Sequence, residues 1–97
     1  MALGYGALDL HLPHCRDLKA KRRLVRGLVD RLHARHRISV AETGGADLLQ
    51  RAVVEVAVVA RDGAEVERIL ETVLRTVDQN DEMVVLDWDT RIIEDEE

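Results

Sequence analysis

In four segments of the chain, apolar and polar residues alternate with a period of two, which predicts β-strands. The segments are residues 8–12, 37–43, 51–60 and 83–93. Pro13 should end the first strand, because proline has no amide to donate to a ladder. The third segment is apolar on both faces apart from Glu55, which is typical of a central strand.

The last segment is expected to place two sets of side chains on opposite faces. One set is Leu86, Trp88, Thr90 and Ile92, and the other is Val85, Asp87, Asp89 and Arg91.

Two further segments have the period of an amphipathic helix. In residues 18–35 the apolar positions are Leu18, Val25, Leu28, Val29 and Leu32. Asp17 is a suitable N-cap for this helix, since its carboxylate can accept the free amides of the first turn. The second helix should start at Asp62, with Glu65 three residues later in a capping-box pattern. Its apolar stripe is Val66, Ile69, Leu70, Val73 and Val77.

The element order βαββαβ predicts an α+β, ferredoxin-like fold, with a four-stranded antiparallel sheet and both helices on one face. We expect residues 1–97 to form one such domain, with an acidic tail at about 94–97. The other face of the sheet should carry Asp9, His11, Glu55, Ala57, Val59, Asp87 and Asp89. A homo-dimer or higher homo-oligomer through this open face would cover Val53, Ala57 and Val59.

Composition narrows the classes of function. Of 97 residues only 2% are aromatic, so the core must be aliphatic and few rings are available for bases to stack on. The single cysteine, Cys15, cannot form an intramolecular disulfide. No signal-peptide pattern or membrane-length apolar run occurs, so we expect a cytoplasmic protein that is not embedded in a membrane.

Positive charge is concentrated in the first helix. Residues 16–37 hold nine of the 14 Lys and Arg residues and only two acids, in a chain of net charge −5. Lys19, Arg23 and Arg26 fall on one exposed stripe, and Lys21 and Arg22 flank the apolar face with their charges expected to reach water. The stripe predicts an anionic partner, for which RNA phosphate is the preferred candidate. The alternative is a solvated face balanced by acids elsewhere.

The loop between the second and third predicted strands gathers a second polar group. Its members are Glu42, Asp47, Gln50 and Arg51. They could form a ligand or partner site, or paired carboxylates could serve acid–base chemistry. The preferred interpretation is structural, with Asp47 and Arg51 holding the loop to the following strand.

The sequence contains neither the ligand spacing of a metal site nor a known catalytic motif. The candidate ligands are His11, His14 and Cys15, together with His33 and His36. They lack the spacing of a zinc site, so no metal or cofactor is expected. No nucleophile motif, phosphate-binding loop or dinucleotide fingerprint occurs, so an enzyme is not expected.

Several pieces of the sequence together resemble the YlxP-like family of uncharacterised small bacterial proteins. They are Leu18-Lys19-x-Lys21-Arg22, Val40-Ala41-Glu42 and Asp47-Leu48-x-Gln50-Arg51-Ala52. The resemblance runs from about Gly4 to Ile92 and implies a ferredoxin-like fold with a role linked to RNA or ribosomes. It implies no catalytic residue. This chain has Leu49 where an aromatic residue often stands, which weakens any argument from stacking.

Together these patterns predict a binding protein that contacts RNA or a ribosomal particle through Lys19, Lys21, Arg22, Arg23 and Arg26. The alternative is a dimeric protein-interaction or small-ligand module with a polar site near Glu42, Asp47 and Arg51.

Overall fold

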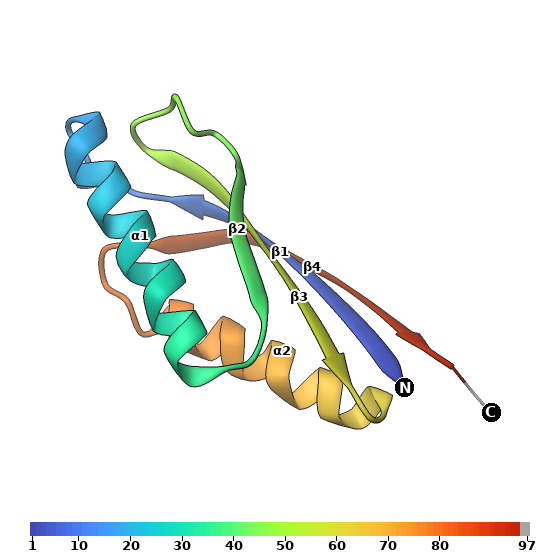
Figure 1. Cartoon of the computed structure of the whole chain (residues 1–97). Coiled ribbons are helices and arrows are strands. Elements are labelled where there is room, and N and C mark those ends of the chain that lie inside the picture. Colours follow the sequence, from blue (N-terminus) through green and yellow to red (C-terminus); the bar gives the residue numbers. More distant parts are fainter. Residues whose placement is uncertain (96–97) are drawn as a thin grey trace.

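The computed structural model describes residues 1–95 and has the predicted element order (Figure 1). The elements are β1 (Ala2–His11), α1 (Leu18–Arg35), β2 (Ser39–Gly44), β3 (Arg51–Ala60), α2 (Gly63–Asp78) and β4 (Val84–Glu94). Of the predicted acidic tail at 94–97, residues 96 and 97 lie outside the described part. No helix within residues 1–95 combines the length and the apolar character that crossing a bilayer would require.

The four strands form one antiparallel sheet in the order β2-β3-β1-β4. The helices lie on the same face of the sheet, α1 against β2 and α2 against β1, β3 and β4 (Figure 1). This arrangement confirms the ferredoxin-like α+β fold. It also confirms that β3 is central, because it lies between β2 and β1.

The core between sheet and helices is aliphatic, as the composition requires. Its largest fully buried apolar side chains are Leu8, Leu10, Leu12, Leu28, Leu32, Val54, Val56, Val66, Val73 and Val77. The two helices contribute through the predicted stripes, and their N-caps are also confirmed. The carboxylate of Asp17 accepts from the amide of Ala20 at 2.7 Å, and that of Asp62 accepts from the amide of Glu65 at 2.9 Å.

Strand β1 begins six residues earlier than the predicted strand, at Ala2 instead of Leu8. The inward positions of this added part are Ala2, Gly4 and Gly6. Because these residues are so small, the sequence shows no alternation of large apolar and polar side chains that would predict a strand here. Small residues are needed there because larger neighbours fill the space. A Cβ at Gly4 would overlap the side chains of Val58 and Val66, and a Cβ at Gly6 would overlap the ring of Trp88.

The predicted faces of β4 are wrong at its start, because a β-bulge interrupts its pairing with β1. Asp87 lies opposite Asp9 but Val85 lies opposite Leu10, so Leu86 is the extra residue. The bulge places Val85 on the inward face, which Trp88 also occupies, and both side chains pack against the core. Leu86 is therefore 49% exposed, instead of sharing an inward face with Trp88.

The close packing at Gly6 predicts opposite effects for two glycine substitutions. Gly6→Ala should lower the free energy of unfolding by about 1–3 kcal/mol, because its methyl group displaces Trp88. Gly27→Ala in α1 should raise it by about 1 kcal/mol, since a Cβ there meets no atom within 4 Å and alanine favours a helix. Urea unfolding of both variants measures the difference. Equal stability of the two variants would contradict the packing of Trp88 on Gly6.

Candidate nucleic-acid interface

The exposed face of α1 presents four cationic side chains around a shallow hollow. Lys19, Arg22, Arg23 and Arg26 are all exposed, and they line a hollow of about 480 Å³ with Gly27 and Asp30. The helical repeat brings these positions together, since residues three, four and seven apart share a face. Gly27 carries no side chain, and the space a Cβ would occupy is open. The hollow is therefore accessible, and four of the six residues that line it are cationic.

The four cations are not neutralised within the described part of the chain. The ion pairs of residues 1–95 are Lys21–Glu42, Arg51–Asp9 and Arg61–Glu65. None of them includes Lys19, Arg22, Arg23 or Arg26. Asp30 is the one acid that lines the hollow. This face can therefore accept an anion without first breaking an internal ion pair.

Lys21 does not belong to this surface, so its predicted exposure is wrong. Its side chain is only 1% exposed, its Nζ lies 3.0 Å from Glu42 Oε2, and it also donates to the carbonyl of Gly45. Lys21 falls four residues before Val25, on the buried stripe of the helix, and that spacing could have revealed its position. Its charge therefore connects α1 to β2 and to the start of the β2–β3 loop.

The polar loop residues do not converge on one site. Glu42 is engaged by Lys21, and Arg51 Nη2 contacts both carboxylate oxygens of Asp9 at 2.8 Å. Gln50 Nε2 donates to the carbonyls of Pro13 and Cys15 at 3.4 Å. Asp47 is exposed in the turn closed by the Leu48 amide and the Gly45 carbonyl. Arg51 thus connects β3 to β1 through Asp9, whereas Asp47 and Arg51 were expected to hold the loop to β3.

The candidate metal ligands are also dispersed. No three His, Cys, Asp or Glu side chains between residues 1 and 95 lie close enough to hold a metal ion. The Nδ1 of His11 lies 3.2 Å from the carbonyl oxygen of Gln50. Cys15 is 4% exposed, and burial is the main cause of the raised pKa of its thiol, with Glu82 and Asp17 adding to it. Cys15 is therefore a packed side chain and not a reactive thiolate.

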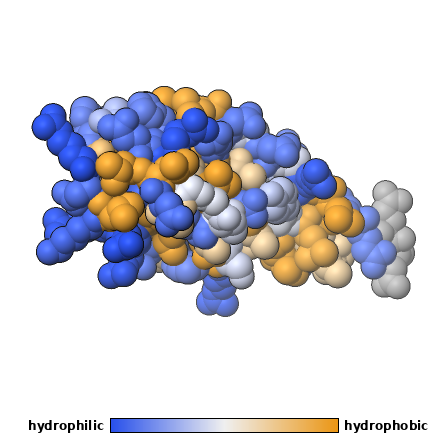
Figure 2. Space-filling model, turned by 90° about the horizontal axis from the view of Figure 1, so that it is seen from above, coloured by the Kyte–Doolittle hydropathy of each residue, from blue (hydrophilic) through white to orange (hydrophobic). Residues whose placement is uncertain are grey.

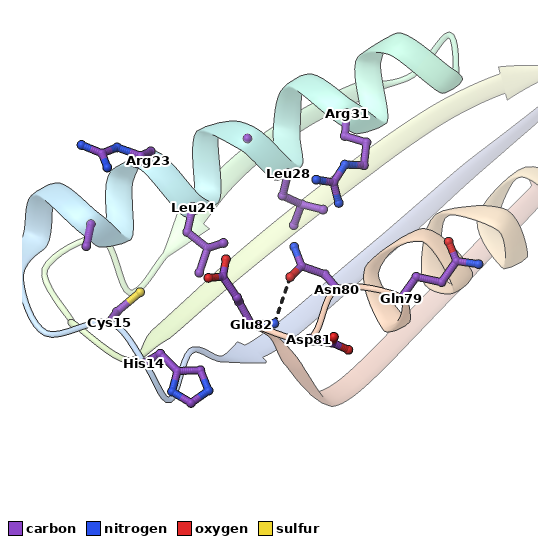
Figure 3. A pocket seen from close by; sticks show the side chains of 12 residues that line it. His14, Cys15, Arg23, Leu24, Leu28, Arg31, Gln79, Asn80, Asp81 and Glu82 are labelled. Atoms are coloured by element: carbon purple, nitrogen blue, oxygen red, sulfur yellow. Dashed lines mark hydrogen bonds between the residues drawn. The ribbon is translucent and has the colours of Figure 1, made fainter.

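A second hollow, which the sequence did not reveal, separates α1 from the loop after α2 (Figure 3). It has a volume of about 580 Å³. Leu24 and Leu28 point into it from α1, and Asn80 and Glu82 point into it from the loop. Arg23 and Gly27 line both this groove and the cationic hollow, so the two are continuous along the helix. In the sequence, residues 78–82 form a short polar run. This pattern predicts a loop, but it does not predict a groove beside α1.

The open face of the sheet carries an apolar cluster at one end. Leu3, Val59 and Ile93 lie side by side on β1, β3 and β4 and are 41%, 66% and 67% exposed. Figure 2 shows apolar side chains gathered at this end of the molecule. The next row holds Tyr5, whose hydroxyl donates to Glu55 at 3.0 Å, and this hydrogen bond raises the pKa of Tyr5. Apolar residues thus occupy the end of the open face, while its middle is polar.

The buried ion pair predicts a large cost for removing Lys21. Lys21→Met should lower the free energy of unfolding by about 3 kcal/mol, because the Glu42 carboxylate and the Gly45 carbonyl lose their partner. Lys19→Met, on the exposed face, should change it by less than about 0.5 kcal/mol. Chemical unfolding of the two variants checks this. Replacing both charges, Lys21→Met with Glu42→Leu, should recover part of the loss.

Comparison with known proteins identifies one similar solved structure and the family to which this chain belongs. No curated protein matches this chain. Among solved structures, the chain is similar to the crystal structure of a C-terminal segment of the alpha subunit of aIF2 from Pyrococcus abyssi. The identity is 15% and the TM-score 0.44, over 99% of this chain and 51% of the other, so this chain spans about half the length of that structure. A family model described as a protein of unknown function (DUF503) matches residues 3–90, and the chain belongs to this family.

Proposed function

We propose that this protein binds RNA through the cationic face of α1, using Lys19, Arg22, Arg23 and Arg26. The observation that carries the proposal is the hollow over Gly27, which these four exposed side chains surround without an ion-pair partner in residues 1–95. Lys21 has no part in binding, because its charge is used internally. The protein as a whole is acidic, so this face is a local exception to its charge.

Phosphate is the anion that best fits this surface. Like charges three or four residues apart on a helix repel one another, so a helix with only a structural role gains nothing from them. A polyanion offers repeated charges along its backbone that can neutralise several of the four cations at once. The open sheet face carries Tyr5 as its aromatic residue, so stacking on the sheet contributes little. Binding should therefore depend mainly on electrostatics.

The cellular setting belongs to the same proposal. We propose that the chain is YlxP-like, that it acts in the cytoplasm, and that its RNA is part of a ribosomal particle. The resemblance of its Lys19-x-Lys21-Arg22 segment supports this setting.

A charge-reversal variant tests the proposal. Lys19→Glu with Arg23→Glu should weaken binding to structured RNA or ribosomal particles by at least about tenfold, because two attractive contacts become repulsive. For the unmodified protein, a plot of log affinity against log salt concentration should have a slope of about −3, as expected for four phosphate contacts. Filter binding or fluorescence anisotropy at several salt concentrations provides both values.

The matched control reverses two exposed arginines on α2, Arg68→Glu with Arg75→Glu. It changes the net charge by the same amount and should reduce binding far less, and circular dichroism should show that both variants are folded. Equal weakening by the two double variants would show that net charge, and not the α1 face, governs binding. Unchanged binding by Lys19→Glu with Arg23→Glu would remove the proposal.

A second candidate function, self-association, is favoured by the apolar cluster of Leu3, Val59 and Ile93. Clusters of this kind on three adjacent strands often mark interaction surfaces. The dimer proposed here covers this end of the open face, including Ala57 and Val59. Val53, which was expected in the same interface, lies farther along β3, opposite Asp9. The accompanying ligand site at Glu42, Asp47 and Arg51 has no geometric support, because Glu42 and Arg51 are paired with other residues.

The dimer predicts a change of mass in one variant. Val59→Asp should convert the protein to a monomer in sedimentation velocity runs, since it places a charge in the buried centre of the interface. Leu48→Asp is the control, because Leu48 is 54% exposed on the β2–β3 loop, away from the sheet face. The same sedimentation coefficient for Val59→Asp and the unmodified protein would rule out this interface.

A further inference from the structure

The groove between α1 and the α2–β4 loop has an apolar floor and polar walls of different kinds. Leu24 and the buried Leu28 form the floor on the α1 side. Figure 3 shows Arg31 directed from α1 toward the gap, with Asn80 and Glu82 directed toward it from the opposite wall. Such a combination suits a flat, mostly apolar molecule with hydrogen-bonding groups on one edge. A nucleobase has these properties.

The loop that carries the polar wall is held in place by its own hydrogen bonds. The Asn80 amide donates to the Val77 carbonyl at 3.0 Å, and the Met83 amide donates to the Asn80 carbonyl at 3.2 Å. Met83 is only 5% exposed and anchors the loop in the core. Asn80 and Glu82 are therefore presented from a fixed backbone, as a selective site requires.

The side chain of Asn80 has a defined orientation. Its Oδ1 accepts from the backbone amide of Glu82 at 3.0 Å, which leaves its Nδ2 as the group facing the groove (Figure 3). The wall thus offers a donor from Asn80 next to an acceptor-only carboxylate from Glu82. Glu82 forms no ion pair within residues 1–95, so its carboxylate is available.

We propose that this groove binds a guanine base of single-stranded RNA, read by Glu82 and Asn80. Guanine is the base whose Watson–Crick edge carries two adjacent donors, N1–H and the N2 amine, beside one acceptor, O6. A carboxylate can accept both donors while an amide donates to O6. Adenine and cytosine each place an unprotonated ring nitrogen on this edge, which would repel the carboxylate, and uracil has one donor between two acceptors.

The inference rests on the proposed RNA binding and adds base selection to it. Arg23 lines both the groove and the cationic hollow, so a strand whose phosphates contact Arg23 and Arg26 can place a base in the groove. Arg31 lies on the other side of Gly27 and can cover the base plane or contact the next phosphate. The hollow supplies affinity and the groove supplies selectivity.

The experiment compares short oligouridine RNAs that contain one central guanosine, one inosine or neither. Inosine keeps N1–H and O6 but lacks the N2 amine. Fluorescence anisotropy with the full chain should show roughly tenfold tighter binding for the guanosine RNA than for the inosine RNA, the value of one charge-assisted hydrogen bond. Glu82→Gln should abolish this difference, and it should change affinity for plain oligouridine by no more than the loss of one negative charge does elsewhere on the protein.

Glu67→Gln, an exposed acid on α2, is the matched control for the lost negative charge and should retain the preference for guanosine. Equal, salt-dependent binding of all three RNAs would overturn the guanine site and leave the proposed phosphate binding intact. A preference for guanosine that persists in Glu82→Gln would also overturn the site. No binding of any RNA, including structured RNA, would overturn both proposals.

Discussion

The orientation of α1 depends on the buried contact of Lys21 with Glu42 and Gly45. The apolar stripe of the helix fixes which side faces the sheet, but apolar contacts are not directional and permit sliding. Because the Lys21 side chain is only 1% exposed, its ammonium group needs its carboxylate and carbonyl partners in place, which fixes the helix relative to β2 and its following loop. The outward positions of Lys19, Arg22, Arg23 and Arg26 follow from this register. One lysine thus controls where the other cations of the segment point.

The same segment divides its cations between two environments. A basic residue on the buried stripe serves the fold, while those a turn away on the solvent side remain without ion-pair partners among residues 1–95. The mixture explains why a short segment of an otherwise acidic chain is so rich in Lys and Arg. Counting its charges alone overstates the exposed cationic surface, because the buried Lys21 is included in the count.

The sequence predicted the fold well where side chains carry the periodicity. α1, β3 and the stripe of α2 are found at the expected residues, and the N-caps Asp17 and Asp62 are confirmed. Prediction failed at the start of β1, where Gly4 and Gly6 leave the inward face without side chains, and at the bulge of β4.

The candidate site could be predicted only in part. The exposed stripe Lys19, Arg23 and Arg26 follows from helical spacing within one element. The partners of Arg51 and Lys21 come from other strands, and no local pattern shows them. The groove with Asn80 and Glu82 likewise exists only because the α2–β4 loop packs near α1.

The bulge at Leu86 makes the outer edge of β4 irregular, and this edge is where a second copy could pair with the sheet. Within the described chain β4 pairs only with β1, so its outer edge offers unpaired amides and carbonyls to any passing strand. The extra residue breaks the regular spacing of those groups, and Asp87, Asp89 and Glu94 add repulsion between two copies of the edge. The bulge that brings Val85 onto the inward face therefore also disfavours edge-to-edge pairing of β4 with a second copy.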